Sequence, residues 1–273
     1  MSRRNSVGDI SHTVVIGGLA AFALLILVGP VVVVLITSLT DSPTLRFPPT
    51  GFSLQWYEKL FDPVASRQIH RAAFNSLEVA MWAAAAAALF GTCAALGLAG
   101  TRSRSARTLD AVFMSPLILP GIAFGLAALM YFSFLGLRPS LMLMIAGHAI
   151  MIVPFVLRTT GASLMQLDPS LSECAASLGS SRLYTFRRIT LPIILPGIAA
   201  GTFMAFMASI DNVPVSLFLS GPRSDMLPIR LWGMMESTLD VRVAAVSGVL
   251  IVSVLVLMLL MERTVGLTKR LKG

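Results

Sequence analysis

The side chains that could carry out chemistry are few and lie far apart in the sequence. The three lysines, Lys59, Lys269 and Lys272, do not follow glycines, whereas a P-loop needs a Gly-Lys pair to hold phosphate groups. The three histidines and two cysteines do not have the spacing of metal ligands or of a nucleophile and its base. Gly161-Ala162-Ser163 has the order of a hydrolase motif without a partner base. We therefore expect a chain that is not an enzyme and that holds no metal and no cofactor of its own.

One carboxylate is singled out by its place in the sequence. Asp211 directly follows an apolar run, and the next apolar stretch, residues 212–220, is too short to cross a membrane. An ionisable group at such a place is costly unless it faces water or a partner. Two interpretations stay open: Asp211 caps or orients the stretch that follows, or it lines a path for a cationic or zwitterionic solute. Trp232 and Met235 would then add apolar walls to that path.

Residues 167–192 form a polar island between apolar runs, and their pattern predicts two short helices. Asp168-Pro169 is typical of a helix start, and Gly179 is typical of a helix end. A second short helix follows, with Arg187 and Arg188 in its last turn, where the helix dipole favours cations. We expect this helix to end before the next apolar segment. A helix, a glycine turn and another helix have a shape that docks into a groove on a partner.

The composition places much of the chain in lipid. Of the 273 residues, 56% are hydrophobic and 12% are charged, whereas soluble domains carry about 25% charged residues. The net charge of +8 does not indicate nucleic acid, because the basic residues lie between apolar runs and not along one face. Cys93 and Cys174 are too few for a disulfide framework. We expect both to be free thiols that serve as small packing residues.

Six apolar runs predict six transmembrane helices, and therefore an all-α integral membrane protein. The first run is longer than a signal-peptide core and lacks a cleavage pattern, so it should remain as a helix. Pro116, Pro120 and Gly121 predict that the third helix is broken or bent. His148, in the fourth run, is interpreted as a hydrogen-bonded packing residue. The six runs are 14–36, 76–98, 111–135, 141–157, 193–209 and 243–261.

Small residues repeat every four positions in the second and fifth runs. Such a ridge lets membrane helices approach closely, so we expect both ridges to face other helices and not lipid. The ridges are Ala83, Ala87, Gly91, Ala95 and Ala99 in the second run, and Gly197, Gly201, Ala205 and Ser209 in the fifth.

The basic residues predict that both termini and residues 158–192 are cytoplasmic. With the termini inside, thirteen Lys and Arg residues fall in inner segments and eight fall in the longer outer segments, which is the bias of the positive-inside rule. The chain then consists of a cytoplasmic segment at 1–13, a six-helix domain at 14–262 and a basic cytoplasmic tail at 263–273.

The polar island also resembles the EAA loop of permease subunits in binding-protein-dependent ATP-binding cassette importers. The family pattern is Glu-Ala-Ala, three residues, Gly, nine residues, then Ile-x-Leu-Pro. Cys174 replaces the first Ala of that pattern, and a cysteine is small enough to keep a packed helix face. The matching positions are Glu173, Cys174, Ala175, Gly179, Ile189, Leu191 and Pro192.

Outside the loop, the chain resembles the spermidine/putrescine-type permeases. This resemblance implies a type I importer permease fold with a coupling-helix loop in a bacterial inner membrane. It also implies a homologous second permease, two ATPase subunits that bind ATP and Mg, and an external solute-binding protein. Asn212 departs from polyamine permeases, which often have a second acidic residue there, so a related amine or amino-acid-like solute stays open. The residues that carry the resemblance are Met114-Ser115-Pro116, Asp211, Ser220-Gly221-Pro222 and Leu227-Pro228.

Two other functions remain as alternatives. A secondary transporter driven by an ion gradient would need an ion site, for which Asp211 and Glu78 offer little, and inverted repeats, which we do not see in the sequence. A structural membrane subunit would need neither. Dependence on ATPase subunits separates an importer permease from the first alternative, and loss of transport with intact assembly after loop mutation separates it from the second.

Overall fold

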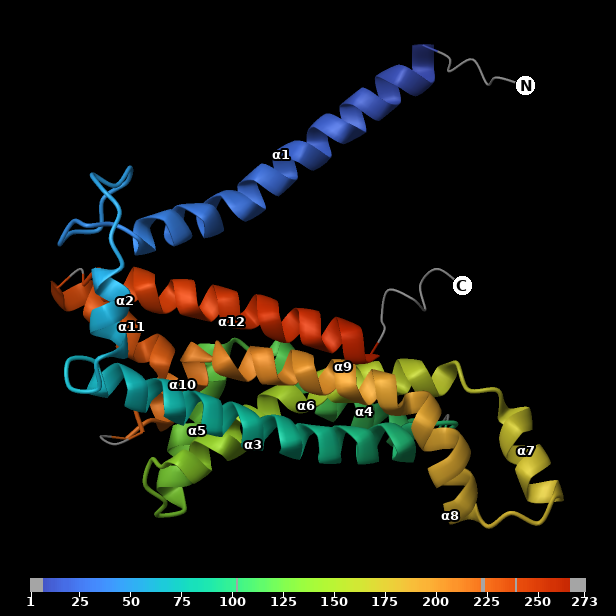
Figure 1. Ribbon diagram of the computed structural model, residues 1–273. Coiled ribbons are helices and arrows are strands. Elements are labelled where there is room, and N and C mark those ends of the chain that lie inside the picture. The colour runs from blue at the N-terminus through green and yellow to red at the C-terminus, as the bar shows by residue number, and fades with distance from the viewer. Residues whose placement is uncertain (1–6, 102, 222–223, 239, 266–273) are drawn as a thin grey trace. The chain divides into compact units, whose positions relative to one another are not determined.

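The computed structural model describes residues 7–101, 103–221, 224–238 and 240–265, and the regular elements within them are helices. The all-α class predicted from the sequence is confirmed (Figure 1). The described residues do not include the tail beyond residue 265 or four of the arginines on which the predicted orientation depends, Arg3, Arg4, Arg102 and Arg223. The helices are α1 Val7–Ser38, α2 Gln55–Phe61, α3 Arg67–Leu98, α4 Arg104–Ile118, α5 Gly121–Phe134, α6 Leu141–Met165, α7 Pro169–Ser177, α8 Arg182–Thr185, the π-helix η1 Phe186–Thr190, α9 Leu191–Ile210, α10 Val213–Leu219, α11 Leu227–Thr238 and α12 Arg242–Val265.

The helices agree with the membrane spans predicted from the sequence. In the described part of the chain, five segments are long and apolar enough to cross a membrane. A sixth span is present if α4 and α5, which meet at an angle of 107°, count as one broken helix. The break lies at the predicted prolines, because Pro120 has no N–H to continue the ladder. The five segments are Val14–Ser38, Arg67–Leu98, Leu141–Met165, Arg182–Ile210 and Arg242–Arg263.

Several predicted boundaries are wrong, because helices continue past the apolar runs. α3 begins at Arg67 and not at residue 76, and α6 continues through Arg158 to Met165. α4 begins at Arg104, inside the expected basic loop, where Ser103 Oγ accepts the N–H of Ala106 at 3.1 Å. Hydropathy marks the part of a helix that lies in lipid, whereas capping marks where the helix begins.

The chain divides into two compact units, Met1–Arg67 with Met234–Leu259, and Gln68–Gly233 with Leu260–Gly273. In the first unit, the Tyr57 hydroxyl lies 2.7 Å from Ser38 Oγ at the end of α1. Arg242 donates from Nη1 to the carbonyl of Ala65 at 2.8 Å and pairs with Asp240 at 2.6 Å. The first bond attaches α2 to the end of α1, and the bond to Ala65 attaches the segment after α2 to the start of α12.

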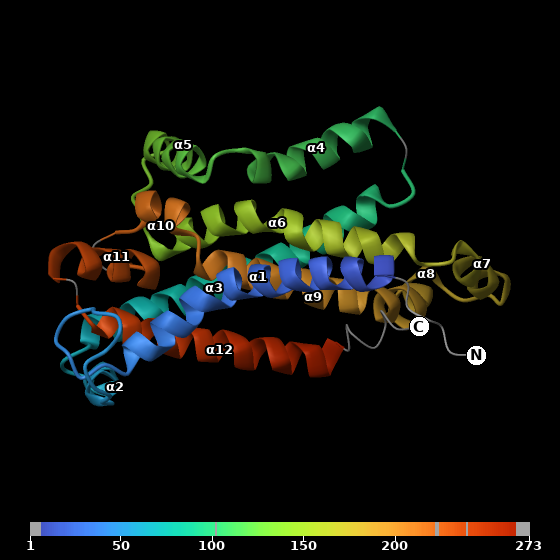
Figure 2. The same cartoon turned by 90° about the horizontal axis from the view of Figure 1, so that it is seen from above.

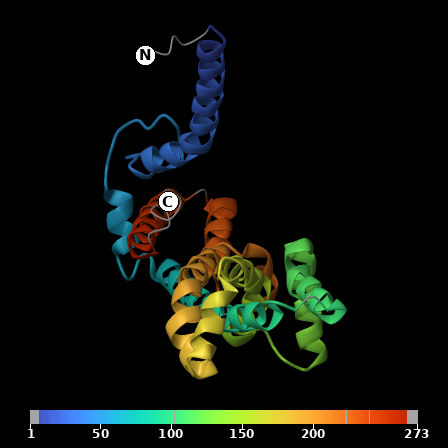
Figure 3. The same cartoon turned by 90° about the vertical axis from the view of Figure 1, so that its right-hand side faces the viewer.

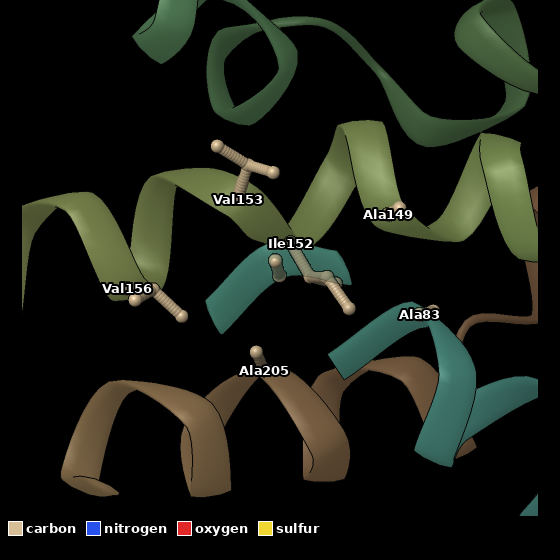
Figure 4. Packing of buried hydrophobic residues seen from close by; sticks show 7 residues of the cluster. Ala83, Ala149, Ile152, Val153, Val156 and Ala205 are labelled. Carbon is tan, nitrogen blue, oxygen red and sulfur yellow. The ribbon is translucent and has the colours of Figure 1, made fainter. Parts of the chain in front are cut away.

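In the second unit, α6 packs against both α3 and α9, which run alongside it (Figures 2 and 3). Ala87 of α3, Ile152 and Val156 of α6, and Ala205 of α9 belong to one buried cluster. Figure 4 shows that Ala205 points toward the side of α6 on which Ile152 and Val156 lie. Figures 1 and 2 show α7 and α8 at one end of these helices and α5 and α10 at the other.

Both small-residue ridges face protein, as predicted. A Cβ built on Gly91 would lie 2.8 Å from the Cβ of Val156, and one on Gly201 would lie 2.8 Å from the Cα of the same residue. The absence of side chains at these two positions therefore allows α3 and α9 to touch α6 at backbone distance. Ala99, the last position of the first ridge, is exposed and does not belong to this contact.

Candidate functional site

The first helix of the predicted loop begins as the sequence indicates. Asp168 Oδ1 accepts the backbone N–H of Ser170 at 2.9 Å, and Pro169 is the first residue of α7. The hydrogen bonds from Ser170 hold the pKa of Asp168 below its usual range, because they stabilise the charged carboxylate. The start of α7 is thus fixed by local hydrogen bonds alone.

The turn after α7 explains the glycine at position 179. Gly179 has a φ of +80°, a left-handed conformation that side chains disfavour. Its N–H donates to the carbonyl of Ala176 at 2.9 Å, and the N–H of Ser180 donates to the carbonyl of Ala175 at 3.0 Å. These two bonds form a Schellman motif, which satisfies the last carbonyls of the helix. The predicted helix end is confirmed.

The second helix of the loop is not separate from the membrane helix, so the prediction that it ends before Pro192 is wrong. Ser181 Oγ caps α8 by accepting the N–H of Tyr184 at 3.3 Å. α8 then passes through the π-helix η1 into α9, and Arg182–Ile210 is helical throughout. Pro192 lies in the first turn of α9, directly after η1, whose backbone hydrogen bonds follow the π-helical and not the α-helical spacing. The loop is therefore joined to the fifth membrane span by continuous helix.

The first motif residues, from Glu173 to Gly179, lie on a short arm that consists of α7, the turn after it and α8, and this arm has an uncovered apolar surface. Leu171, Leu178 and Leu183 are 43%, 86% and 61% exposed, whereas Ala175 is buried. Uncovered apolar side chains of this kind mark interaction sites. Ile189 lies in η1, and Leu191 and Pro192 lie in α9, so the structure does not gather the motif residues into one cluster. The exposed ones are Glu173, Cys174, Gly179 and Pro192, and the half-buried ones are Ile189 and Leu191.

The two cysteines are free thiols, as expected, but both are exposed. The expectation that they serve as packing residues is therefore wrong within this chain. Cys93 is on the face of α3 opposite the ridge, and Cys174 is on the arm.

Asp211 lies at the corner between α9 and α10, and its carboxylate is exposed. The cap of α10 comes instead from Asn212, whose Oδ1 accepts the N–H of Val215 at 3.2 Å. Among the described residues, the carboxylate of Asp211 makes no hydrogen bond or ion pair. The interpretation of Asp211 as a side-chain cap is thus wrong, and its roles in orienting this stretch or in lining a path stay predictions.

His148 holds this corner from the middle of α6. Its Nδ1 lies 2.8 Å from Ser209 Oγ at the end of α9, and its Nε2 lies 3.1 Å from Ser216 Oγ in α10. The imidazole is fully buried, and each ring nitrogen has a serine hydroxyl as its partner, as buried polar groups require. The predicted role of His148 as a hydrogen-bonded packing residue is confirmed. The sequence did not reveal its serine partners, because they lie 61 and 68 residues away.

Trp232 and Met235 are the other two candidate residues for the solute path. Both lie on α11 and are exposed, by 65% and 47%. Trp232 belongs to the second compact unit and Met235 to the first.

The described residues show no group of three or more His, Cys, Asp and Glu side chains that could hold a metal ion. Ser163, the serine of the apparent hydrolase motif, lies against the place where a Cβ of Gly197 would be. This serine therefore packs against α9.

Comparisons with known proteins agree on one family. A family model described as "Binding-protein-dependent transport system inner membrane component" matches residues 87–266. The spermidine/putrescine transport system permease protein PotC of Haemophilus influenzae is 28% identical over 85% of this chain and 89% of its own. The putrescine transport system permease protein PotI of Escherichia coli K12 is 31% identical over 74% of this chain and 73% of its own. A solved bacterial alginate ABC transporter, in complex with an alginate-bound periplasmic protein, has a chain of the same fold, with a TM-score of 0.73, 17% identity, and coverage of 94% and 95% of the two chains.

Proposed function

Because the chain belongs to the family of binding-protein-dependent transport system inner membrane components, and is thus a permease subunit of an ATP-binding cassette importer, we propose that its cargo is a small organic amine such as a polyamine. The relatives named for spermidine and putrescine support this substrate class. The observation that carries the proposal is the exposed carboxylate of Asp211, which no other described residue neutralises.

The corner at Asp211 suits an ammonium group. A cation that leaves water loses hydration, and a fixed carboxylate offsets part of that loss. His148 contacts the hydroxyls of Ser209 and Ser216, one on each side of the corner, and so connects the end of α9 to α10. In this proposal Trp232, which is exposed in the same unit as Asp211, provides an apolar wall for the methylene chain of the amine.

In this proposal the arm α7–α8 transmits ATP hydrolysis in the partner subunits to the membrane helices. Its uncovered leucines fit a groove on a partner, and we assign that groove to an ATPase subunit on the cytoplasmic side. Two such subunits would bind ATP and Mg, because this chain has no Gly-Lys pair for phosphate. A homologous second permease and an external solute-binding protein complete the importer, with both termini of this chain in the cytoplasm.

The test is uptake by the complete importer in proteoliposomes. Asp211→Asn should lower ATP-dependent uptake of radiolabelled putrescine or spermidine about tenfold, which corresponds to about 1.4 kcal/mol of lost charge stabilisation, while assembly and basal ATP hydrolysis persist. Asp225→Asn is the matched control, because Asp225 is also exposed in the second unit and its described contact uses the backbone carbonyl. This control should transport normally.

Two results would contradict the proposal. Equal uptake by wild type and Asp211→Asn would remove the carboxylate from the path. Uptake that continues without ATP, on an ion gradient alone, would instead favour a secondary transporter. Binding of putrescine and spermidine to the cognate external protein, measured by calorimetry, identifies the cargo independently of both results.

A further inference from the structure

A separate cavity of about 770 Å³ lies between the ends of α3, α4 and α6. It is bounded by the turn at residues 99–101 and by the last two turns of α6. This is the end of the second unit from which the chain continues into α7. Asp211 does not line the cavity.

The charged side chains of this cavity leave a surplus of positive charge. Two are cationic, Arg107 and Arg158, and one is anionic, Asp110. Arg158 Nη2 contacts Asp110 Oδ2 at 3.3 Å, and its Nε contacts Met114 Sδ at 3.1 Å. Its Nη1 has no partner among the described residues, and neither has the guanidinium of Arg107. Both arginines can therefore donate to an anion.

The rest of the cavity wall is mostly apolar. Leu98 of α3 and Leu157, Leu164 and Met165 of α6 line it, together with small residues. Both helices are long and apolar enough to cross a membrane, so the apolar wall of the cavity belongs to segments that are suited to lipid. A site with a cationic rim and apolar walls at the end of membrane helices matches an anionic phospholipid, because the headgroup phosphate and the acyl chains each meet a suitable surface.

We propose that this cavity binds the phosphate of an anionic phospholipid such as phosphatidylglycerol. A cationic amine is disfavoured here, because two guanidinium groups repel it. The site is therefore distinct from the cargo path, and the proposal does not depend on which solute is carried. Since the cavity joins the start of α4 to the last turns of α6, a bound lipid would link these helices immediately before the arm.

The experiment measures lipid retained by the complete importer. The complex is purified in detergent, mixed with equal amounts of phosphatidylglycerol and phosphatidylcholine, and analysed by native mass spectrometry. Arg107→Gln and Arg158→Gln should each lower the affinity for phosphatidylglycerol about fivefold, since one arginine near an anionic surface contributes about 1 kcal/mol. Arg104→Gln is the control, because Arg104 is exposed on the same helix and does not line the cavity.

A variant that should increase lipid retention distinguishes loss of the binding site from misfolding of the protein. Asp110→Asn should raise the retention of phosphatidylglycerol, because it removes the carboxylate that pairs with Arg158. An equal loss in Arg104→Gln, or unchanged retention in all four variants, would overturn the proposal. Glycerol phosphate, added at constant ionic strength, should not displace the lipid. If it binds with the same dependence on Arg107 and Arg158, the site takes a soluble phosphate and the proposal of a lipid is wrong.

Discussion

Replacing Gly201 with alanine inserts one methyl group between α9 and α6. A Cβ there would lie 2.8 Å from the Cα of Val156 and 3.2 Å from the carbonyl oxygen of Phe155, and would also meet Thr159 Oγ1. Backbone atoms cannot rotate away. The Thr159 hydroxyl is held at 3.0 Å and 3.2 Å from the carbonyls of Phe155 and Val156. The two helices must therefore separate.

The magnitude follows from two opposing effects. Overpacking typically costs about 1–3 kcal/mol, whereas alanine gains about 1 kcal/mol over glycine in helix propensity. Gly201→Ala should therefore change the free energy of unfolding by about 0–2 kcal/mol toward instability. Gly161→Ala is the matched control on α6, because a Cβ there meets nothing within 4 Å. It keeps the propensity gain alone and should be about 1 kcal/mol more stable than wild type.

The assay is denaturant unfolding of the purified permease in detergent, followed by circular dichroism. The two alanine variants should differ in their free energy of unfolding by about 1–3 kcal/mol. Since both gain the same helix propensity, this difference measures only the contact of position 201 with α6. Gly201→Leu should unfold at still lower denaturant, because its side chain is larger. The reasoning is refuted if Gly201→Ala is as stable as Gly161→Ala, or if crosslinking places Gly201 against lipid.

Three further predictions follow from local geometry. Gly179→Val should abolish the coupling of ATP hydrolysis to uptake while membrane insertion persists, because a valine side chain disfavours the φ of +80° at this position. Gly136→Val is the control: Gly136 has a similar φ of +73° but lies outside the arm, so this variant should keep coupling. His148→Ala should lower the free energy of unfolding by about 1–3 kcal/mol, measured by denaturant titration, because two buried hydroxyls lose their partner; an unchanged value would contradict the bonds. Burial raises the pKa of Asp240, but the hydrogen bonds and charge of Arg242 outweigh it and hold this pKa below its usual range. The pair therefore stabilises the fold above the unfolded pKa of aspartate, and that stabilisation is lost as pH falls through the folded pKa. Melting temperatures from pH 7 to pH 3 should fall less steeply for Asp240→Asn than for wild type, and parallel curves would refute the assignment.

Features that depend on neighbouring residues could be predicted from the sequence. Asp168 and Gly179 are local capping signals, and the structure has both caps where the residues indicate them. The ridges were also predictable, since a four-residue repeat defines one face of a helix whatever packs against it. The third-span break followed from Pro120 in the same way.

Features that depend on distant residues could not be predicted. Nothing near His148 in the sequence identifies Ser209 and Ser216 as its partners. The cavity with Arg107 and Arg158 arises only when α4 and α6 are placed side by side. In the sequence alone, its arginines are explained by membrane topology.

The π-helical turn Phe186–Thr190 sets the angular phase between the arm and the membrane span. Each residue of an α-helix turns the side-chain direction by about 100°, and a π turn holds one residue more than an α turn. Deleting one residue from this turn would therefore leave an ordinary α turn, and α8 would keep nearly the same direction around the axis of α9. Deleting one residue from α8 itself would instead rotate the part of the arm that precedes it by about 100°. The glycines of α9 would stay packed against α6 in both cases. The π turn is thus the place where the helix can change its length by one residue without redirecting the arm.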